Sequence, residues 1–107
     1  MTEEKKLDIK VARYFKDMKP YIVGIRKEQG KFSQRRGVAD WLVCCNGLFI
    51  AIELKVGKNK LTEHQKDFAD DIIRAGGRSF CCRSIEEIKE VIDICMNRKP
   101  GGRELWI

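Results

Sequence analysis

One short turn constrains the fold of this chain more than any other feature. Asn46-Gly47 lies between two apolar runs, Val38–Cys45 and Leu48–Val56. Asn-Gly in this setting is the strongest short-range signal for a type I′ hairpin turn, because both turn residues need a positive φ. A two-residue turn also sets the register, since residue 45 then faces residue 48. Both faces of the hairpin are mostly apolar, so we expect it in the middle of a sheet that is covered on both sides.

Patterns on either side of the hairpin predict further helices and strands. Apolar residues spaced three or four apart indicate helices, and short apolar runs bounded by polar residues indicate strands. Two capping boxes, Thr62-x-x-Gln65 and Ser84-x-x-Glu87, begin two of the helices, and Gly76-Gly77 ends the first of these. The further elements are a helix over residues 2–19, strands over 21–26 and 79–82, a helix over 62–75 and a helix after residue 84.

This order of elements, αβββαβα, predicts one α/β domain over residues 1–107, with its core at about 3–96 and a C-terminal tail at 97–107. The helix between the third and fourth strands makes a right-handed parallel crossover. We therefore expect a mixed central sheet with helices on both faces.

Charge and cysteine content narrow the functional class. The formal net charge is +6, which is typical of small domains that bind nucleic acid, although charge also serves solubility. The five cysteines show no C-x-x-C spacing and accompany a single histidine, so a zinc site is not indicated. We interpret them as small buried apolar residues in a reducing cytosol. We find no apolar run as long as a membrane span and no pattern of a secretory signal.

The hairpin register brings three charged residues together. Asp40 is expected directly opposite Glu53, with Lys55 two residues further along on the same face. Two carboxylates about 5 Å apart repel each other by roughly 3 kcal/mol at an effective dielectric of about 20. A divalent cation would offset this repulsion, and oxygen ligands favour Mg²⁺ or Mn²⁺. The alternative is a solvent-exposed end of the hairpin, but the apolar run 48–52 continues into Glu53 without a break.

Two other polar residues could join these charges. Glu4 continues the inward apolar stripe of the first helix, whereas Glu3 and Asp8 lie off it. A carboxylate there would reach the hairpin, and the alternative is that Glu4 only complements the helix dipole. Gln65, as the third residue of its capping box, is expected to bond back to Thr62. Its functional alternative is to hold a water molecule or a phosphate.

Basic residues gather on both sides of the hairpin, including Arg26, Lys27 and Lys31 before it. Such side chains contact phosphates without reading base sequence, and a solvated loop is the alternative for any one of them. Gly37 follows Arg35 and Arg36, and a glycine there lets the backbone turn tightly and leaves room for a phosphate. The DNA-binding residues that we predict are Arg35, Arg36, Gly37, Lys58 and Lys60.

Three ordered motifs give the chain a resemblance to a known family. They are Arg35-Arg36-Gly37-Val38-Ala39-Asp40, Glu53-Leu54-Lys55 and Leu61-Thr62-Glu63-His64-Gln65, with Glu4 on the first helix. In this order and spacing they resemble the VRR-NUC (virus-type replication-repair nuclease) family of the PD-(D/E)XK nuclease superfamily, of the stand-alone phage and bacterial type. The resemblance spans about residues 3–92. It departs from the family at Ala39, where members usually have a proline that shapes the backbone and holds no metal.

The resemblance implies a restriction-endonuclease-like core and a DNA endonuclease that acts in DNA repair. It implies that Mg²⁺ or Mn²⁺ is bound by Asp40, Glu53 and the backbone carbonyl of Leu54, with Glu4 bound directly or through water. Lys55 would orient or deprotonate the attacking water and stabilise the developing charge, and Gln65 would position the active-site groups. The catalytic set is then Asp40, Glu53, Lys55 and Gln65. The enzyme would act as a homodimer on branched DNA such as Holliday junctions, with no organic cofactor and no membrane partner.

Three alternatives stay open from the sequence. The same fold could bind DNA without cutting it, and a nuclease of this kind could act on other DNA structures or on RNA. The apolar residues Leu105-Trp106-Ile107 could dock on the body of the protein or on another subunit.

Overall fold

The computed structural model describes residues 1–27 and 35–97. Its elements are α1 (Glu3–Asp17), β1 (Ile22–Arg26), β2 (Trp41–Cys45), β3 (Leu48–Leu54), α2 (Glu63–Arg74), β4 (Arg78–Cys82) and α3 (Ile85–Met96). Two of the sequence predictions concern residues outside this range: Lys31, and the apolar residues Leu105-Trp106-Ile107. None of the helices in the described part has the length and apolarity that crossing a membrane requires.

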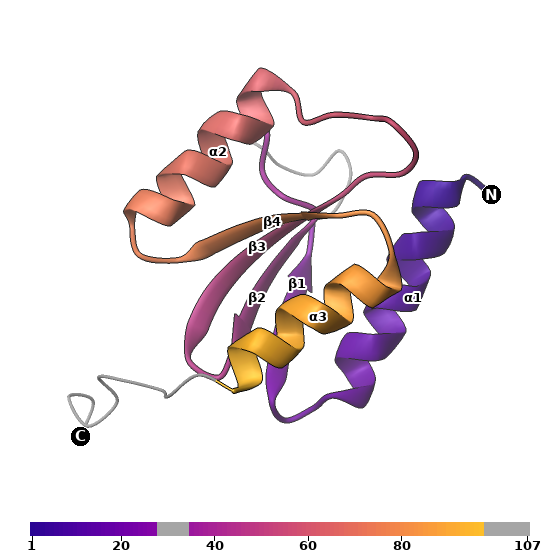
Figure 1. The fold of residues 1–107 in the computed structure, drawn as a ribbon, viewed down its shortest axis with the longest axis vertical. Coiled ribbons are helices and arrows are strands. Elements are labelled where there is room, and N and C mark those ends of the chain that lie inside the picture. Colours follow the sequence, from indigo (N-terminus) through magenta and orange to yellow (C-terminus); the bar gives the residue numbers. More distant parts are fainter. Residues whose placement is uncertain (28–34, 98–107) are drawn as a thin grey trace.

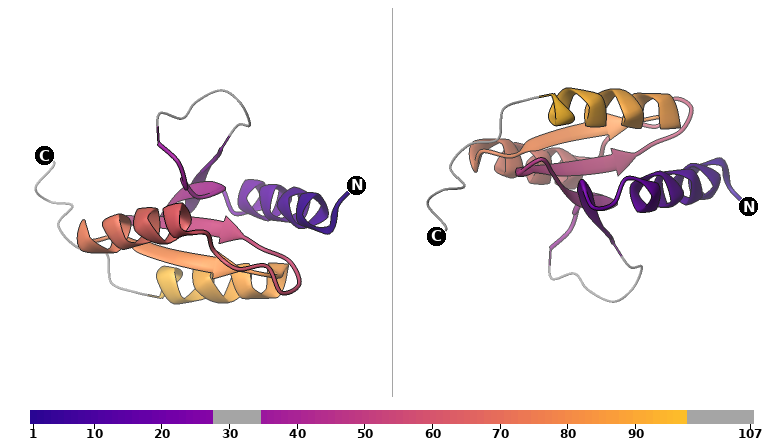
Figure 2. Two further views of the ribbon diagram at one scale, coloured as in Figure 1. Left: turned by 90° about the horizontal axis from the view of Figure 1, so that it is seen from above. Right: turned by 90° about the horizontal axis from the view of Figure 1, so that it is seen from below.

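The four strands form one sheet in the order β1-β2-β3-β4. The pairs β1–β2 and β2–β3 are antiparallel, and β3–β4 is parallel, so the predicted α/β class with a mixed sheet is confirmed. Figure 1 shows α2 on one side of the sheet and α1 and α3 on the other side. Figure 2 shows that α3 runs alongside β4.

The Asn46-Gly47 turn has the predicted conformation. Both residues have positive φ, 52° for Asn46 and 79° for Gly47, as a type I′ turn requires. The predicted register follows from it, because Val43 pairs with Ile50 in the antiparallel ladder. The Asn46 side chain also donates a hydrogen bond of 3.0 Å to the Cys95 carbonyl, which fixes the end of α3 beside the turn.

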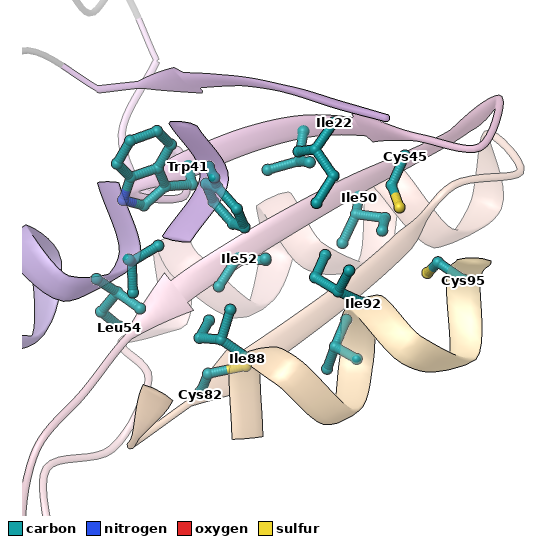
Figure 3. Packing of buried hydrophobic residues seen from close by; sticks show 14 of the residues in the cluster. Ile22, Trp41, Cys45, Ile50, Ile52, Leu54, Cys82, Ile88, Ile92 and Cys95 are labelled. Atoms are coloured by element: carbon teal, nitrogen blue, oxygen red, sulfur yellow. The ribbon is translucent and has the colours of Figure 1, made fainter. Parts of the chain in front are cut away.

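The main core lies between the sheet and the two helices α1 and α3. The residues labelled in Figure 3 show the part of it between the strands and α3. Ile50 and Ile52 on β3 are fully buried in one cluster with Ile88 and Ile92 on α3. Burying one such side chain stabilises a fold by about 1.5–3 kcal/mol. Trp41 belongs to the same cluster, which confirms its interpretation as a core residue.

Two of the predicted strands are shorter than expected. The second was predicted from Val38 but begins at Trp41, and the third was predicted to Val56 but ends at Leu54. Pairing with β4 also stops at Leu54. The charged residues Asp40 and Lys55 therefore lie just beyond the ends of the β2–β3 ladder.

The prediction that the hairpin is covered on both sides is wrong for β2. Cys44 is exposed, so the interpretation of all five cysteines as buried is wrong for this one, and Cys81 is only half-buried. Three others are buried, and no disulfide joins any of the five. The second capping box also forms only in part. Ser84 accepts from the Glu87 amide, but the Glu87 carboxylate accepts from the Arg83 amide instead of closing the box on Ser84.

Candidate metal centre

The candidate site lies at the end of the hairpin that is opposite the Asn46-Gly47 turn. Asp40 directly precedes β2, Glu53 is the next-to-last residue of β3, and Glu4 is in the first turn of α1. One carboxylate oxygen from each of the three lies within 4.8 Å of the others. The cleft around them has a volume of about 540 Å³ and is lined by Thr2, Glu4, Lys5, Asp8, Arg26, Lys27, Asp40, Glu53, Leu54, Lys55 and Gln65.

Glu53 is the most unusual residue of this cleft. It is 7% exposed, and it is the one charged residue among the buried residues of the described chain. Its buried Oε1 has no hydrogen-bond partner within residues 1–27 and 35–97. Burial, followed by the adjacent Asp40 carboxyl, raises the pKa of Glu53 to about 9, and the cations of Lys27 and Lys55 oppose this shift. In the absence of a bound cation, the Glu53 carboxyl therefore holds its proton at neutral pH.

Asp40 is held in place by the backbone on both sides of it. Its Oδ2 accepts a hydrogen bond of 2.8 Å from the Leu54 amide, across the end of the hairpin. Its carbonyl accepts one of 2.8 Å from the Lys27 amide. The first bond engages one of the two carboxylate oxygens, so the other can bind a cation without loss of this support.

Two lysines line the cleft beside the carboxylates. Lys55 follows β3 directly and is half-buried, and its amide donates to the Cys82 carbonyl at 3.1 Å. Lys27 comes from the end of β1, and its Nζ donates to the Val38 carbonyl at 3.1 Å. The sequence predicts Lys27 only as one of several basic residues near the hairpin. The structure brings it into the same cleft as Lys55.

Asp8 is a second residue that sequence reasoning missed. It lies off the apolar stripe of α1, yet it lines the cleft. Its Oδ1 accepts from the Trp41 indole at 2.8 Å, and its Oδ2 pairs with the Arg26 guanidinium at 3.2 Å. Both oxygens are thus used within the protein, which fits a supporting role. Its spacing of one helical turn from Glu4 could have revealed it.

Gln65 reaches the cleft while it caps α2. Its Oε1 accepts from the Thr62 amide at 2.8 Å, and the Thr62 hydroxyl accepts from the Gln65 amide at 3.2 Å. The capping role that the sequence favours is confirmed. Because Oε1 is engaged, the part of the side chain that remains for a ligand is its NH₂ group.

Two of the predicted DNA-binding residues make contacts within the protein. Arg35 pairs with Asp71 at 2.6 Å and lies over the Phe68 ring at 5.0 Å, so it attaches its segment to α2. Gly37 has a φ of 81°, and a Cβ there would come within 2.2 Å of the His64 carbonyl oxygen. The sequence predicts that a phosphate approaches Gly37 closely, but in the structure the backbone of α2 lies against this glycine. The other three predicted residues, Arg36, Lys58 and Lys60, are exposed.

The residues of the cleft fit a hard divalent cation. They offer carboxylate oxygens, which are the ligands that Mg²⁺ and Mn²⁺ prefer, and the described residues that line the cleft include neither histidine nor cysteine. A cation would also place a positive charge beside the buried Glu53 carboxyl. Comparison of the chain with protein-family models, curated proteins and solved structures finds no match. The resemblance to VRR-NUC nucleases thus depends on the motifs and their order.

Proposed function

We propose that this chain is a Mg²⁺- or Mn²⁺-dependent DNA endonuclease that hydrolyses phosphodiester bonds. One observation carries the proposal: Glu53, whose buried Oε1 has no hydrogen-bond partner among the described residues, belongs to a carboxylate cluster with Glu4 and Asp40. A buried carboxyl in this state is unfavourable for folding, so its presence beside two other carboxylates favours a functional explanation.

In this proposal Glu4, Asp40 and Glu53 hold the cation, with the Leu54 carbonyl as a further ligand. When bound, a divalent cation neutralises the carboxylates, polarises a phosphate and lowers the pKa of a water molecule. The hydrogen bond from the Leu54 amide to Asp40 would preserve the position of this carboxylate before and after binding. Fixed ligands of this kind reduce the reorganisation that the reaction requires.

Two lysines would act on the reacting groups. Lys55 lines the cleft beside Glu53, where its ammonium can orient the attacking water and stabilise negative charge that develops on the phosphate. Lys27 is tethered to the Val38 carbonyl, two residues before Asp40, so its charge is held close to the same phosphate. Gln65 would use its NH₂ group to position a phosphate oxygen or a water molecule.

The proposed substrate is branched DNA, such as a Holliday junction, in the course of DNA repair. Exposed Arg36, Lys58 and Lys60 would contact phosphates next to the cleft, which explains affinity without base recognition. One site cuts one strand, so the proposal includes two copies that act together on a symmetric junction. Two copies can pair in solution or meet on the DNA.

A cleavage assay tests the proposal. Four-way junctions, flaps, linear duplex and RNA are incubated with Mg²⁺ or Mn²⁺, using the wild type, Asp40→Asn, and Asp17→Asn as a control that removes one carboxylate from the far end of α1. We expect the wild type and Asp17→Asn to cut branched DNA, and Asp40→Asn to lose at least about 100-fold in rate.

The assay also separates the alternatives. DNA binding without cleavage by the wild type under every divalent cation would indicate a binding module and contradict the proposal. Faster cleavage of linear duplex or RNA than of junctions would keep the chemistry and overturn the substrate. Circular dichroism of each variant shows that a loss of rate is not a loss of folding.

A further inference from the structure

The two faces of the sheet are covered unequally. The main core covers one face, and α2 packs on the opposite face over β4. Among the described residues, no helix covers that second face over β1 and β2 (Figure 1). The register places five apolar residues together there, and we call them the open face: Val23, Ile25, Leu42, Cys44 and Phe49.

The open face exposes much apolar surface for a small domain. Val23 is 61% exposed, Ile25 64% and Phe49 43%. A contiguous apolar patch on a protein surface marks an interaction site, and here it borders the edge strand β1. A patch of this kind is expected to be covered by a segment of the chain or by a partner.

The C-terminal end of α3 lies on the core side of the sheet, beside the hairpin turn at one end of the open face. The Asn46 side chain donates to the carbonyls of Cys95 and Met96, so α3 ends beside the hairpin turn. The register places the row formed by Val23, Cys44 and Phe49 one pair away from the pair that flanks this turn. The chain thus leaves α3 at the end of the sheet where the open face begins.

The sequence after Asn97 suits a return to this face. Pro100, Gly101 and Gly102 disfavour a longer helix, and the residues up to Glu104 are otherwise charged. Leu105-Trp106-Ile107 then supplies three large apolar side chains. An extended chain from Asn97 to Leu105 reaches roughly 26 Å, which exceeds the spacing of about 10 Å between packed layers.

We propose that Leu105-Trp106-Ile107 folds back around the hairpin turn and docks on the open face. The size of the patch favours this segment over a second copy of the chain. A standard interface between two proteins uses roughly 20–30 residues from each partner, whereas the open face has five. This inference does not depend on the proposed nuclease activity, and pairs of copies would use another surface.

Cys44 allows a direct test, because it is an exposed thiol on the open face. In the full chain, Leu105→Cys introduces a second thiol in the docking segment. Dilute protein is then oxidised with diamide, which takes up the two thiol hydrogens as the disulfide forms. The matched control is Ile94→Cys, because Ile94 is 68% exposed on α3, which packs against the other face.

We expect a disulfide within one chain between Cys44 and position 105, formed at least about 10-fold faster than any disulfide between Cys44 and position 94. Mass spectrometry of tryptic peptides identifies the linkage, and the double variant Leu105→Cys/Cys44→Ser should lack it. A disulfide that joins two chains would assign the face to a second copy and overturn the proposal. A rate no higher than that of the control would overturn it as well.

Fluorescence gives a second readout without engineered thiols. Trp106→Phe supplies the signal of Trp41 alone, so the difference from the wild type reports on Trp106. We expect acrylamide to quench Trp106 at least about 2-fold more strongly in Val23→Asp than in the unaltered chain, because a buried charge is costly and would displace the segment. Equal quenching in the two proteins would contradict docking.

Discussion

The two ends of the β2–β3 hairpin belong to the same pair of strands but differ in almost every physical respect. At one end, Asn46-Gly47 closes a tight turn and contacts α3. At the other end, Asp40 and Glu53 bring carboxyl groups together, and a buried oxygen of Glu53 has no partner. At the turn, each residue adopts a backbone conformation that its type favours. At the carboxylate end, a buried polar atom lacks the hydrogen bond that buried polar atoms normally make.

This contrast teaches where function is to be sought in a small fold. A turn that meets every local preference needs no ligand to explain it, whereas a buried carboxyl with an unsatisfied oxygen beside another carboxyl does. The turn also serves the site at a distance, since it sets the register that brings Asp40 across to the Leu54 amide.

The largest effect is expected at the carboxylate end of the hairpin, from loss of the positively charged Lys55 side chain. Lys55→Ala should reduce kcat for DNA cleavage by roughly 10²–10⁴-fold, because the ammonium would stabilise charge in the transition state. Mn²⁺ affinity should change little, since lysine is not a ligand. Single-turnover kinetics and calorimetry measure the two quantities.

Lys58→Ala is the matched control for charge, because it removes one exposed lysine from the following loop. It should raise KM and leave kcat nearly unchanged, since a phosphate contact contributes to binding. Equal losses of kcat in the two variants would contradict a specific role for Lys55.

A smaller effect is expected on stability, from the proton that Glu53 holds. Its pKa is about 9 in the fold against 4.5 as the ordinary value, so the folded state favours the protonated form. The resulting stability is fully present below about pH 4.5 and is lost as the pH rises through 9. The metal-free protein should therefore lose up to about 1.4 kcal/mol of unfolding free energy per pH unit in this window.

Denaturant titrations at several pH values measure this slope. Glu53→Gln should remove most of it, because glutamine has no proton to lose, and saturating Mn²⁺ should reverse it in the wild type. If the slope is the same in Glu53→Gln as in the wild type, the account of Glu53 is wrong.

The smallest effect is expected at the turn end. Gly47→Ala should destabilise the protein by about 1 kcal/mol, because alanine rarely adopts the φ of 79° found there. A Cβ at this position meets nothing within 4 Å, so the cost is one of backbone conformation alone. Thermal unfolding measures it, and cleavage per folded molecule should be unchanged. A large loss of activity would show that the two ends are less independent than proposed.

Much of the fold could be predicted because its signals are local. The Asn-Gly turn, the Thr62 cap and the apolar stripes each act over a few residues, and the turn with its register, the α2 capping box and the mixed sheet agree with the structure. The exposed Cys44 was not predicted, because the sequence of β2 does not reveal how far α2 extends across the sheet.

The site was predictable in part for the same reason. Asp40 and Glu53 are related by the local register, and Glu4 by the helical stripe. Lys27 and Asp8 enter the cleft through tertiary contacts: Lys27 through the Val38 carbonyl, and Asp8 through Trp41 and Arg26. No short-range pattern in the sequence encodes the Lys27 contact, whereas the i, i+4 spacing of Glu4 and Asp8 already places both on one side of α1.

The central claim is that the carboxylate end of the hairpin binds a divalent cation. Calorimetric titration with Mn²⁺ tests it most directly, using the wild type and Glu53→Gln at pH 6 and pH 8. We predict measurable binding by the wild type that strengthens at the higher pH and releases a proton, because the cation displaces the proton of Glu53. Affinity should fall at least about 10-fold in Glu53→Gln. Equal affinity in the two proteins, or no binding by the wild type at millimolar Mn²⁺, would contradict the account.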